Sequence, residues 1–149
     1  MTQLRTYMSG DHRRCDDLLA AAEQALSSHD LAATRAAFGH FSRATQAHFR
    51  AEEELLFPAF EEKTGIRMGP TQMMRLEHGQ MRELMAEADG ALADGDEDSY
   101  VGAVETLLIL MQQHNLKEEN VLYPMCDEQL RVEAETLLPQ LQQTVGGES

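Results

Sequence analysis

The residues best able to do chemistry in this chain are two copies of the pattern His-x-x-x-Glu. They are His48 with Glu52 and His114 with Glu118. Residues four apart lie one above the other on a helix, with Cβ atoms about 5–6 Å apart, so an imidazole and a carboxylate can reach one metal cluster from the same side. An ionised glutamate buried without a partner is strongly destabilising, and two of them among imidazoles require cations. The pattern therefore predicts a metal centre.

An internal duplication with an offset of 66 residues relates the two patterns, because the segment HFRAEEELLFP recurs as HNLKEENVLYP. The same offset relates Asp11-His12 to Glu77-His78, so each copy contributes one further histidine. Two neutral histidines for each of two divalent metals, with two carboxylates able to bridge them, is a reasonable ligand set. The predicted metal ligands are His12, His48, Glu52, His78, His114 and Glu118. The sequence offers no separate set of catalytic residues.

Four long helices must position these ligands, and capping and turn residues indicate where they begin and end. We expect helices over about 9–28, 30–63, 70–94 and 98–125, with Ser9 as the first N-cap and Pro70 in the first turn of the third helix. A weaker amphipathic helix follows at about 127–142. Short connections imply an all-α, antiparallel up-down-up-down four-helix bundle, built from a duplicated helical hairpin plus a short C-terminal helix. The length suits a single domain over 1–149, with the bundle at about 9–126.

Each predicted helix carries an apolar stripe at alternating three- and four-residue steps, and the ligands lie on these stripes. An alternative is a purely structural polar layer of His–Glu hydrogen bonds. Agreement of six residues with both the duplication and four separate stripes disfavours it. The stripes are His12, Cys15, Leu19, Ala22 and Leu26; Phe38, Phe41, Thr45, His48, Glu52 and Leu55; Met74, His78, Met81, Met85, Ala88 and Leu92; and Val104, Leu107, Met111, His114, Glu118 and Val121.

The charge balance narrows the possible partners. Acidic residues number 26 against 12 basic ones, for a formal charge of -14. Such a surface repels phosphate backbones and anionic lipid, so we expect neither nucleic-acid nor membrane binding. No apolar run of signal-peptide or membrane-spanning length is found, and two cysteines make no disulfide framework. We therefore expect a cytoplasmic protein.

These residues resemble the hemerythrin family, in particular the bacterial HHE cation-binding domains, from His12 to Pro124. The resemblance implies an antiparallel four-helix bundle holding two non-heme, carboxylate-bridged iron ions. Oxygen-carrying hemerythrins place a fifth histidine four residues after the one matching His78, where this chain has Arg82. The set of four histidines and two glutamates is closer to that of bacterial repair-of-iron-centres proteins. Those usually carry an N-terminal domain with paired cysteines, which this sequence lacks.

The resemblance implies a protein that handles NO, O₂ or peroxide in stress response or in iron-centre repair. Its partners would be small diatomic ligands or peroxide, with an iron–sulfur client protein as a further candidate. The alternative is an O₂-binding or O₂-sensing hemerythrin-like module that acts through a partner. Whether the centre is enzymatic is left open.

Several residues near the predicted centre have open roles. Glu53 and Glu119 repeat with the ligands but lie beside the stripe, so supporting or surface roles fit them better than ligation. Arg82 could pair with Asp16, its repeat partner, or stay in solvent. Cys15 is either ordinary core packing, which we favour, or a reactive thiol near the centre.

Overall fold

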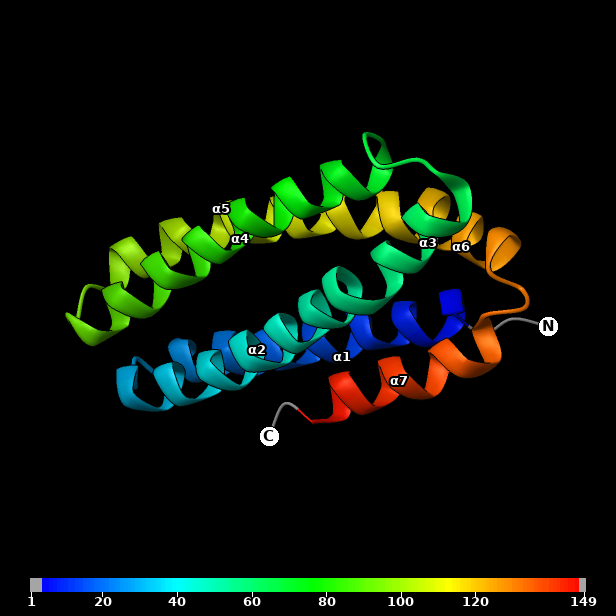
Figure 1. The fold of residues 1–149 in the computed structure, drawn as a ribbon. Helices are drawn as coiled ribbons and strands as arrows, with labels where there is room; N and C mark the ends of the chain where they lie inside the picture. Colours follow the sequence, from blue (N-terminus) through cyan, green and yellow to red (C-terminus); the bar gives the residue numbers. More distant parts are fainter. Residues whose placement is uncertain (1–3, 148–149) are drawn as a thin grey trace.

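The computed structural model of this chain describes residues 4–147, and every regular element within that range is helical. Helices α1 (Leu4–Ser27) and α2 (Leu31–Ala51) pack side by side, as do α4 (Pro70–Ala93) and α5 (Glu97–Lys117) (Figure 1). The two hairpins then face each other along α2 and α4. The predicted all-α bundle is thus confirmed.

The first hairpin turns at His29, whose φ of 55° is in the left-handed region, and α2 begins after Asp30. The Asp30 side chain accepts a hydrogen bond from the Ala33 amide at 3.0 Å, as an N-cap does. The predicted start of the first helix at Ser9 is wrong, since Ser9 is a buried residue inside α1. The helix is already formed at Leu4, because Leu4 and Met8 are fully buried and extend its apolar stripe towards the N-terminus.

The second hairpin has the predicted signals at both ends of its first helix. Pro70 occupies the first turn of α4, and the helix ends at Ala93 before Asp94. Gly95 has a φ of 72°, which favours glycine, and Asp96 accepts the Ser99 amide at 3.1 Å to begin α5.

Both helices that carry the His-x-x-x-Glu pattern contain a π-helical turn directly after the histidine's turn. These are η1 (Glu52–Leu56), continuing as α3 (Phe57–Thr64), and η2 (Glu118–Leu122), continuing as α6 (Tyr123–Gln129). A π-helical turn holds one more residue than an α-helical one, so the core-facing positions beyond it move on by one. The predicted stripe position Val121 is therefore wrong, since it is 52% exposed and Leu122 is buried instead. Leu55 packs against the core only as a partly buried residue, and Leu56 is the fully buried position.

Two apolar clusters fill the bundle, one on each side of a polar layer. The first lies towards the two hairpin turns and includes Phe38, Phe41, Met85 and Leu107. The second lies around the π-helical turns and the C-terminal helix and includes residues such as Leu56. Between them lie the predicted ligands, which are the main buried polar groups of the bundle. Such a layer must satisfy its own charges, because the surroundings are apolar.

Helix α7 (Ala134–Gly146) differs from its predicted span of about 127–142. Residues up to Gln129 belong to α6, and the chain leaves the helical conformation at the buried Leu130 (φ -109°, ψ 31°). Helix α7 then packs against α2 and η1 through Leu137, Leu141 and Val145. Burial of Val145 explains why the helix runs beyond the predicted end.

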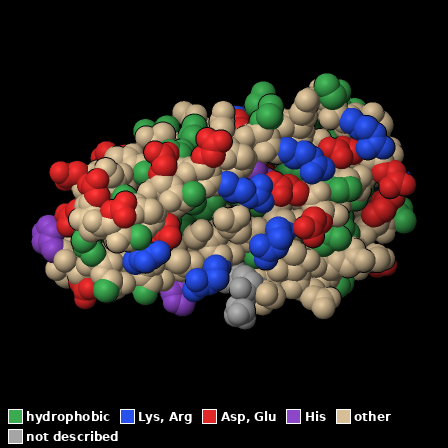
Figure 2. Space-filling view, turned by 60° about the vertical axis from the view of Figure 1, so that its left-hand side comes forward, with side chains coloured by type: hydrophobic (Ala, Val, Ile, Leu, Met, Phe, Trp, Pro, Cys, Tyr) green, Lys and Arg blue, Asp and Glu red, His purple; other side chains and the backbone are tan. Residues whose placement is uncertain are grey.

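On the face shown in Figure 2, acidic side chains lie next to the basic ones. Three ion pairs illustrate this on α2, α3, α4 and η1: Arg35–Asp89, Arg75–Glu61 and Arg82–Glu53. In the described part of the chain, no helix combines the length and apolar character needed to cross a bilayer.

Candidate metal centre

All six predicted ligands meet in the polar layer, in two groups of four that could each hold a metal ion. One group is His12, His48, Glu52 and Glu118, and the other is Glu52, His78, His114 and Glu118. In each group the candidate ligand atoms lie within 4.8 Å of one another, and all six residues are buried. The two glutamates belong to both groups, so their carboxylates lie between two histidine pairs.

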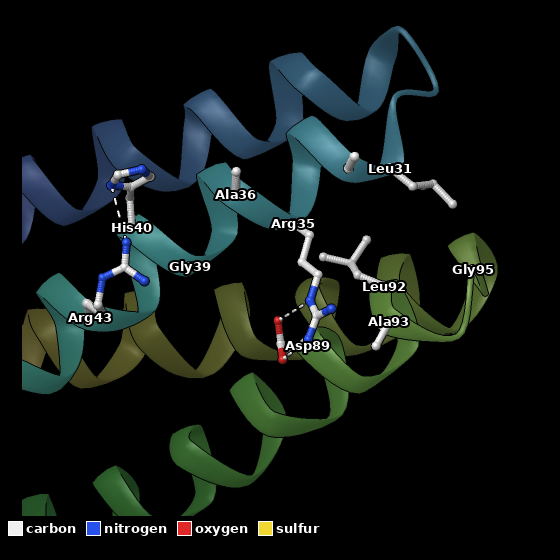
Figure 3. Close-up of a pocket in the computed structure, with 11 residues that line it drawn as sticks. Leu31, Arg35, Ala36, Gly39, His40, Arg43, Asp89, Leu92, Ala93 and Gly95 are labelled. Carbon is white, nitrogen blue, oxygen red and sulfur yellow. Dashed lines mark hydrogen bonds and ion pairs between the residues drawn. The ribbon is translucent and has the colours of Figure 1, made fainter.

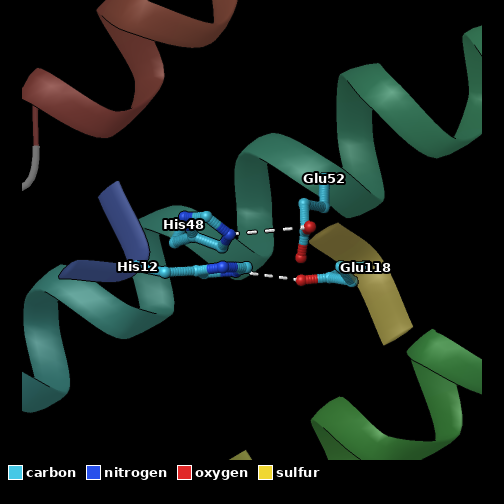
Figure 4. Close-up of side chains that lie close together, drawn as sticks. All are labelled: His12, His48, Glu52 and Glu118. Carbon is cyan, nitrogen blue, oxygen red and sulfur yellow. Dashed lines mark hydrogen bonds and ion pairs between the residues drawn. The ribbon is translucent and has the colours of Figure 1, made fainter. Parts of the chain in front are cut away.

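Both hairpins contribute to the first group (Figure 4). His12 comes from α1, His48 and Glu52 from the junction of α2 with η1, and Glu118 from the start of η2. The His12 Nε2 atom lies 3.0 Å from Glu118 Oε1, and the His48 Nε2 atom lies 3.5 Å from Glu52 Oε2. Ligands from the two halves of the duplication therefore converge on one point.

The second group repeats this arrangement around the other two oxygens. The His78 Nε2 atom lies 3.0 Å from Glu52 Oε1, and the His114 Nε2 atom lies 3.2 Å from Glu118 Oε2. Each carboxylate thus turns one oxygen to each histidine pair, so both groups share the two glutamates.

Each of the four histidines of the candidate centre has a carboxylate partner at its other ring nitrogen, Nδ1. His48 Nδ1 donates to Asp11 at 2.7 Å and His114 Nδ1 to Glu77 at 2.8 Å. Such partners fix the tautomer and leave Nε2 with its lone pair directed at the centre. Asp11 precedes His12 in sequence, yet it supports the histidine of the neighbouring helix. The sequence signal for this role was the duplicated acid before each first histidine.

The two remaining histidines are supported across the hairpins. His78 Nδ1 donates to Glu53 at 2.7 Å, and His12 Nδ1 donates to Glu119 at 2.7 Å. The open role of Glu53 and Glu119 is therefore a supporting one. Both lie one residue after a shared glutamate, and the carboxylate points to the opposite hairpin.

Basic side chains fix three of these supporting carboxylates. Arg14 donates to Asp11 at 2.8 Å, and Lys117 pairs with Glu77. Arg82 donates to both oxygens of Glu53 at 2.8 Å each, so it neither pairs with Asp16 nor points to solvent. Arg82 pairs with Glu53 because the Glu53 carboxylate extends from η1 to α4, where it also accepts the hydrogen bond from His78. Burial would raise the pKa of Glu53, but bonds from His78 and Arg82 lower it to about 2.

The electrostatics of the layer fit a bound cation. Four buried ligand atoms make no hydrogen bond: Glu52 Oε1, His78 Nε2, His114 Nε2 and Glu118 Oε2. Nitrogen lone pairs facing carboxylate oxygens repel unless a proton or metal ion lies between them. Burial would lower the pKa of His114, yet the Glu118, Glu52 and Glu77 carboxylates raise it to about 9. Burial would raise the pKa of Glu52, but the charge of His48 holds it well below its usual range.

Residues 4–126 match the family model of the hemerythrin HHE cation-binding domain. The chain belongs to the hemerythrin HHE family. Neither the curated proteins nor the solved structures gave a match. Hemerythrin domains bind iron, and together with the two buried groups this supports a metal-binding function for the chain.

Tyr123 is a residue of the hemerythrin-like centre that the ligand pattern missed. It is the first residue after η2, it is fully buried, and its hydroxyl donates to Glu52 Oε2 at 2.6 Å. Burial and the charges of Glu118 and Glu52 raise the pKa of Tyr123 well above its usual value. The only signal in the sequence was that Tyr123 corresponds to Phe57 in the duplication.

Cys15 lies beside the hemerythrin-like centre as a buried residue with 3% of its surface exposed. Burial raises the pKa of its thiol to about 11, which opposes the nucleophilic thiolate form. The favoured interpretation as core packing fits this position better than a reactive role.

A surface hollow of about 670 Å³ lies between α2 and α4 and contains none of the six candidate ligands of the hemerythrin-like domain (Figure 3). Arg35 crosses it to Asp89, with N–O distances of 3.1 and 3.2 Å. The six candidate ligands are therefore buried within the bundle and do not line this hollow.

Proposed function

We propose that this chain is a non-heme di-iron protein that handles NO, O₂ or peroxide in stress response or iron-centre repair. His12 and His48 would hold one iron, and His78 and His114 the other. Glu52 and Glu118 would bridge the two.

The observation that carries this proposal is the sharing of both glutamates between the two groups. A single metal would need one group of donors, whereas here two equivalent sets surround one pair of carboxylates. The histidine nitrogens and carboxylate oxygens form a donor set that suits iron. The carboxylate behind each imidazole would raise its basicity and hold its orientation, as is usual for metal-bound histidine.

Burial limits the class of ligand. His78 and both bridging glutamates have no exposed surface, and His48 and His114 are exposed by 2% and 1%. A substrate larger than a few atoms could not reach these donors without opening the bundle. Iron, when bound, supplies redox chemistry and open coordination positions for small molecules. The chain itself would hold the donors in place and exclude bulk water with the two apolar clusters.

Arg82 favours reactive handling over reversible oxygen carriage. It occupies the position where oxygen-carrying hemerythrins have a fifth histidine, and both its guanidinium contacts to Glu53 direct it away from the centre. The iron near His78 would then have one protein ligand fewer than in the carriers. The alternative is an O₂-binding or O₂-sensing module that acts through a partner. Such a module would need a stable O₂ adduct that forms reversibly.

The first test is elemental analysis of protein purified without added metal or chelator. The proposal expects about two irons per chain. In variants that still fold, His48→Ala should lose the iron of one group and Glu118→Ala should lose iron from both groups. Absence of bound iron in the parent, after anaerobic loading with iron(II), would contradict it. In a second step the reduced protein is exposed separately to O₂, NO and peroxide. Turnover or irreversible oxidation supports stress handling, and an O₂ adduct that reverses under vacuum supports the alternative.

A further inference from the structure

The duplication makes the two halves of the centre equivalent except at a few positions, and the most consequential is Tyr123 against Phe57. Both residues directly follow a π-helical turn, and both are fully buried. The Phe57 ring lies 5.8 Å from that of His78, and the Tyr123 ring lies 5.6 Å from that of His12. The two rings are thus placed alike, and a hydroxyl is added at one end only.

That hydroxyl lies among all four donors of the first group. Tyr123 Oη is 2.6 Å from Glu52 Oε2 and 3.0 Å from Glu118 Oε1. It is also 3.1 Å from His48 Nε2 and 3.2 Å from His12 Nε2. One phenol proton can satisfy one of these four atoms. A hydrogen-bonding role with Glu52 alone therefore does not explain why the oxygen is close to the other three.

A metal ion held by these four donors would lie about 2 Å from each of them. An oxygen within hydrogen-bonding distance of all four is then close to the metal position itself. At the other end of the centre, Phe57 supplies no oxygen and a second ring, Phe49, stacks on His78 at 3.9 Å. The second position is thus enclosed by hydrocarbon where the first has a phenol.

The charged side chains outside the ligands also differ between the two ends of the centre. Arg82 neutralises Glu53 behind His78, whereas the repeat-related position behind His12 is Asp16. Asp16 and Glu119 line one groove between α1 and α5. An acid therefore replaces a base at the end that contains Tyr123, which favours a metal ion of higher charge there.

We propose that Tyr123 is a fifth protein ligand to the iron held by His12 and His48, and that it binds iron(III) as a phenolate. On binding, the Tyr123 O–H bond breaks, the proton leaves to solvent, and the phenolate oxygen donates an electron pair to iron(III). No change of oxidation state is involved. The two iron positions are then chemically different, with the phenolate position stabilising the ferric state. This inference rests on the proposed di-iron function.

The test is the visible absorption and resonance Raman spectrum of protein loaded with iron(II) under anaerobic conditions and then oxidised with ferricyanide. Phenolate bound to iron(III) gives a charge-transfer band and enhanced tyrosinate ring modes. The parent should show both, Tyr123→Phe should lose both while retaining about two irons per chain, and Phe57→Tyr should gain a second phenolate signal. Tyr123→Phe introduces the residue type that the repeat-related position, Phe57, already has, so the variant should fold.

Tyr100→Phe is the matched control, since Tyr100 is buried in the other apolar cluster and should leave the spectrum unchanged. A parent with two irons and no phenolate signal, or a Tyr123→Phe variant that keeps the signal, overturns the inference alone. A parent that binds no iron contradicts the proposed function, and the inference falls with it. Metal content measured on the same samples separates these results.

Discussion

The Glu53 carboxylate accepts a hydrogen bond from His78 Nδ1 at 2.7 Å, although the two residues belong to different copies of the duplicated hairpin. Glu119 and His12 repeat this contact in the opposite direction, also at 2.7 Å. The two hairpins are thus joined by reciprocal bonds in which each copy orients a histidine of the other. The centre is therefore incomplete in either hairpin alone.

Replacing Glu53 with Gln should weaken iron binding without removing a ligand. The amide cannot stabilise the Nδ1 proton as a carboxylate does, and we expect a loss of about 10–100-fold in affinity. Competition against a chelator of known affinity measures it. Glu54→Gln is the matched control, because Glu54 is the exposed neighbour of Glu53. Equal affinity of the Glu53 variant and the parent would mean that the carboxylate only pairs with Arg82.

Substituting a ligand that both groups share should lower the iron content more than substituting a ligand of one group. Glu52 belongs to both groups, so Glu52→Gln should reduce binding at both positions. His12 belongs to one group, so His12→Ala should leave about one iron per chain. Elemental analysis after desalting checks both variants. If Glu52→Gln also retained one iron, the carboxylate would serve a single metal and would not bridge.

Arg82→Gln should change the stability of the fold very little. The Arg82 and Glu53 side chains are 33% and 21% exposed, so solvent screens the pair and we expect a loss below about 1 kcal/mol. Iron release should nevertheless accelerate, because Glu53 is no longer held against His78. Denaturant unfolding and stopped-flow chelation measure the two effects. Arg50→Gln, on the exposed side of α2, is the control. A large stability loss with unchanged release would assign Arg82 to folding only.

Deleting Asn120 should preserve the fold and damage the centre. This residue lies in η2, and without it the π-helical turn becomes an α-helical one that still directs Leu122 and Tyr123 to the core. Stability should stay within about 1 kcal/mol of the parent, while iron content falls because the backbone of the turn that carries Glu118 and Glu119 changes conformation. Deleting Gln112, an exposed residue of α5, should instead rotate His114 off the core face and unfold the protein. Full iron content after the Asn120 deletion would show that the extra residue is irrelevant to the site.

Both cysteines should react slowly with iodoacetamide in the folded protein. They are buried free thiols, and with a pKa of about 11 Cys15 is ionised in only about one molecule in ten thousand at pH 7. Mass spectrometry of native and urea-unfolded samples measures the rates. Fast labelling of Cys15 in the native protein, but not in a Cys15→Ser variant, would restore the hypothesis of a reactive thiol.

The sequence by itself determined the helices and the six candidate ligands. Helical periodicity places His48 and Glu52 on one face, and the 66-residue duplication repeats that face in His114 and Glu118. Helical periodicity and the duplication are both visible in the sequence, so they can be recognised without knowledge of the fold. The predicted start of the first helix was wrong, because the burial of Leu4 depends on packing against residues distant in sequence.

Only the tertiary structure decided what surrounds the ligands. Asp11 precedes His12 but supports His48, and Arg82 pairs with Glu53 from another helix. These choices depend on how helices are rotated against one another, which periodicity does not specify. The π-helical turns were equally hidden, because one additional residue in a helix leaves no signature in a single sequence. They place Tyr123 beside Glu52, and so the difference between the two halves of the centre comes from packing.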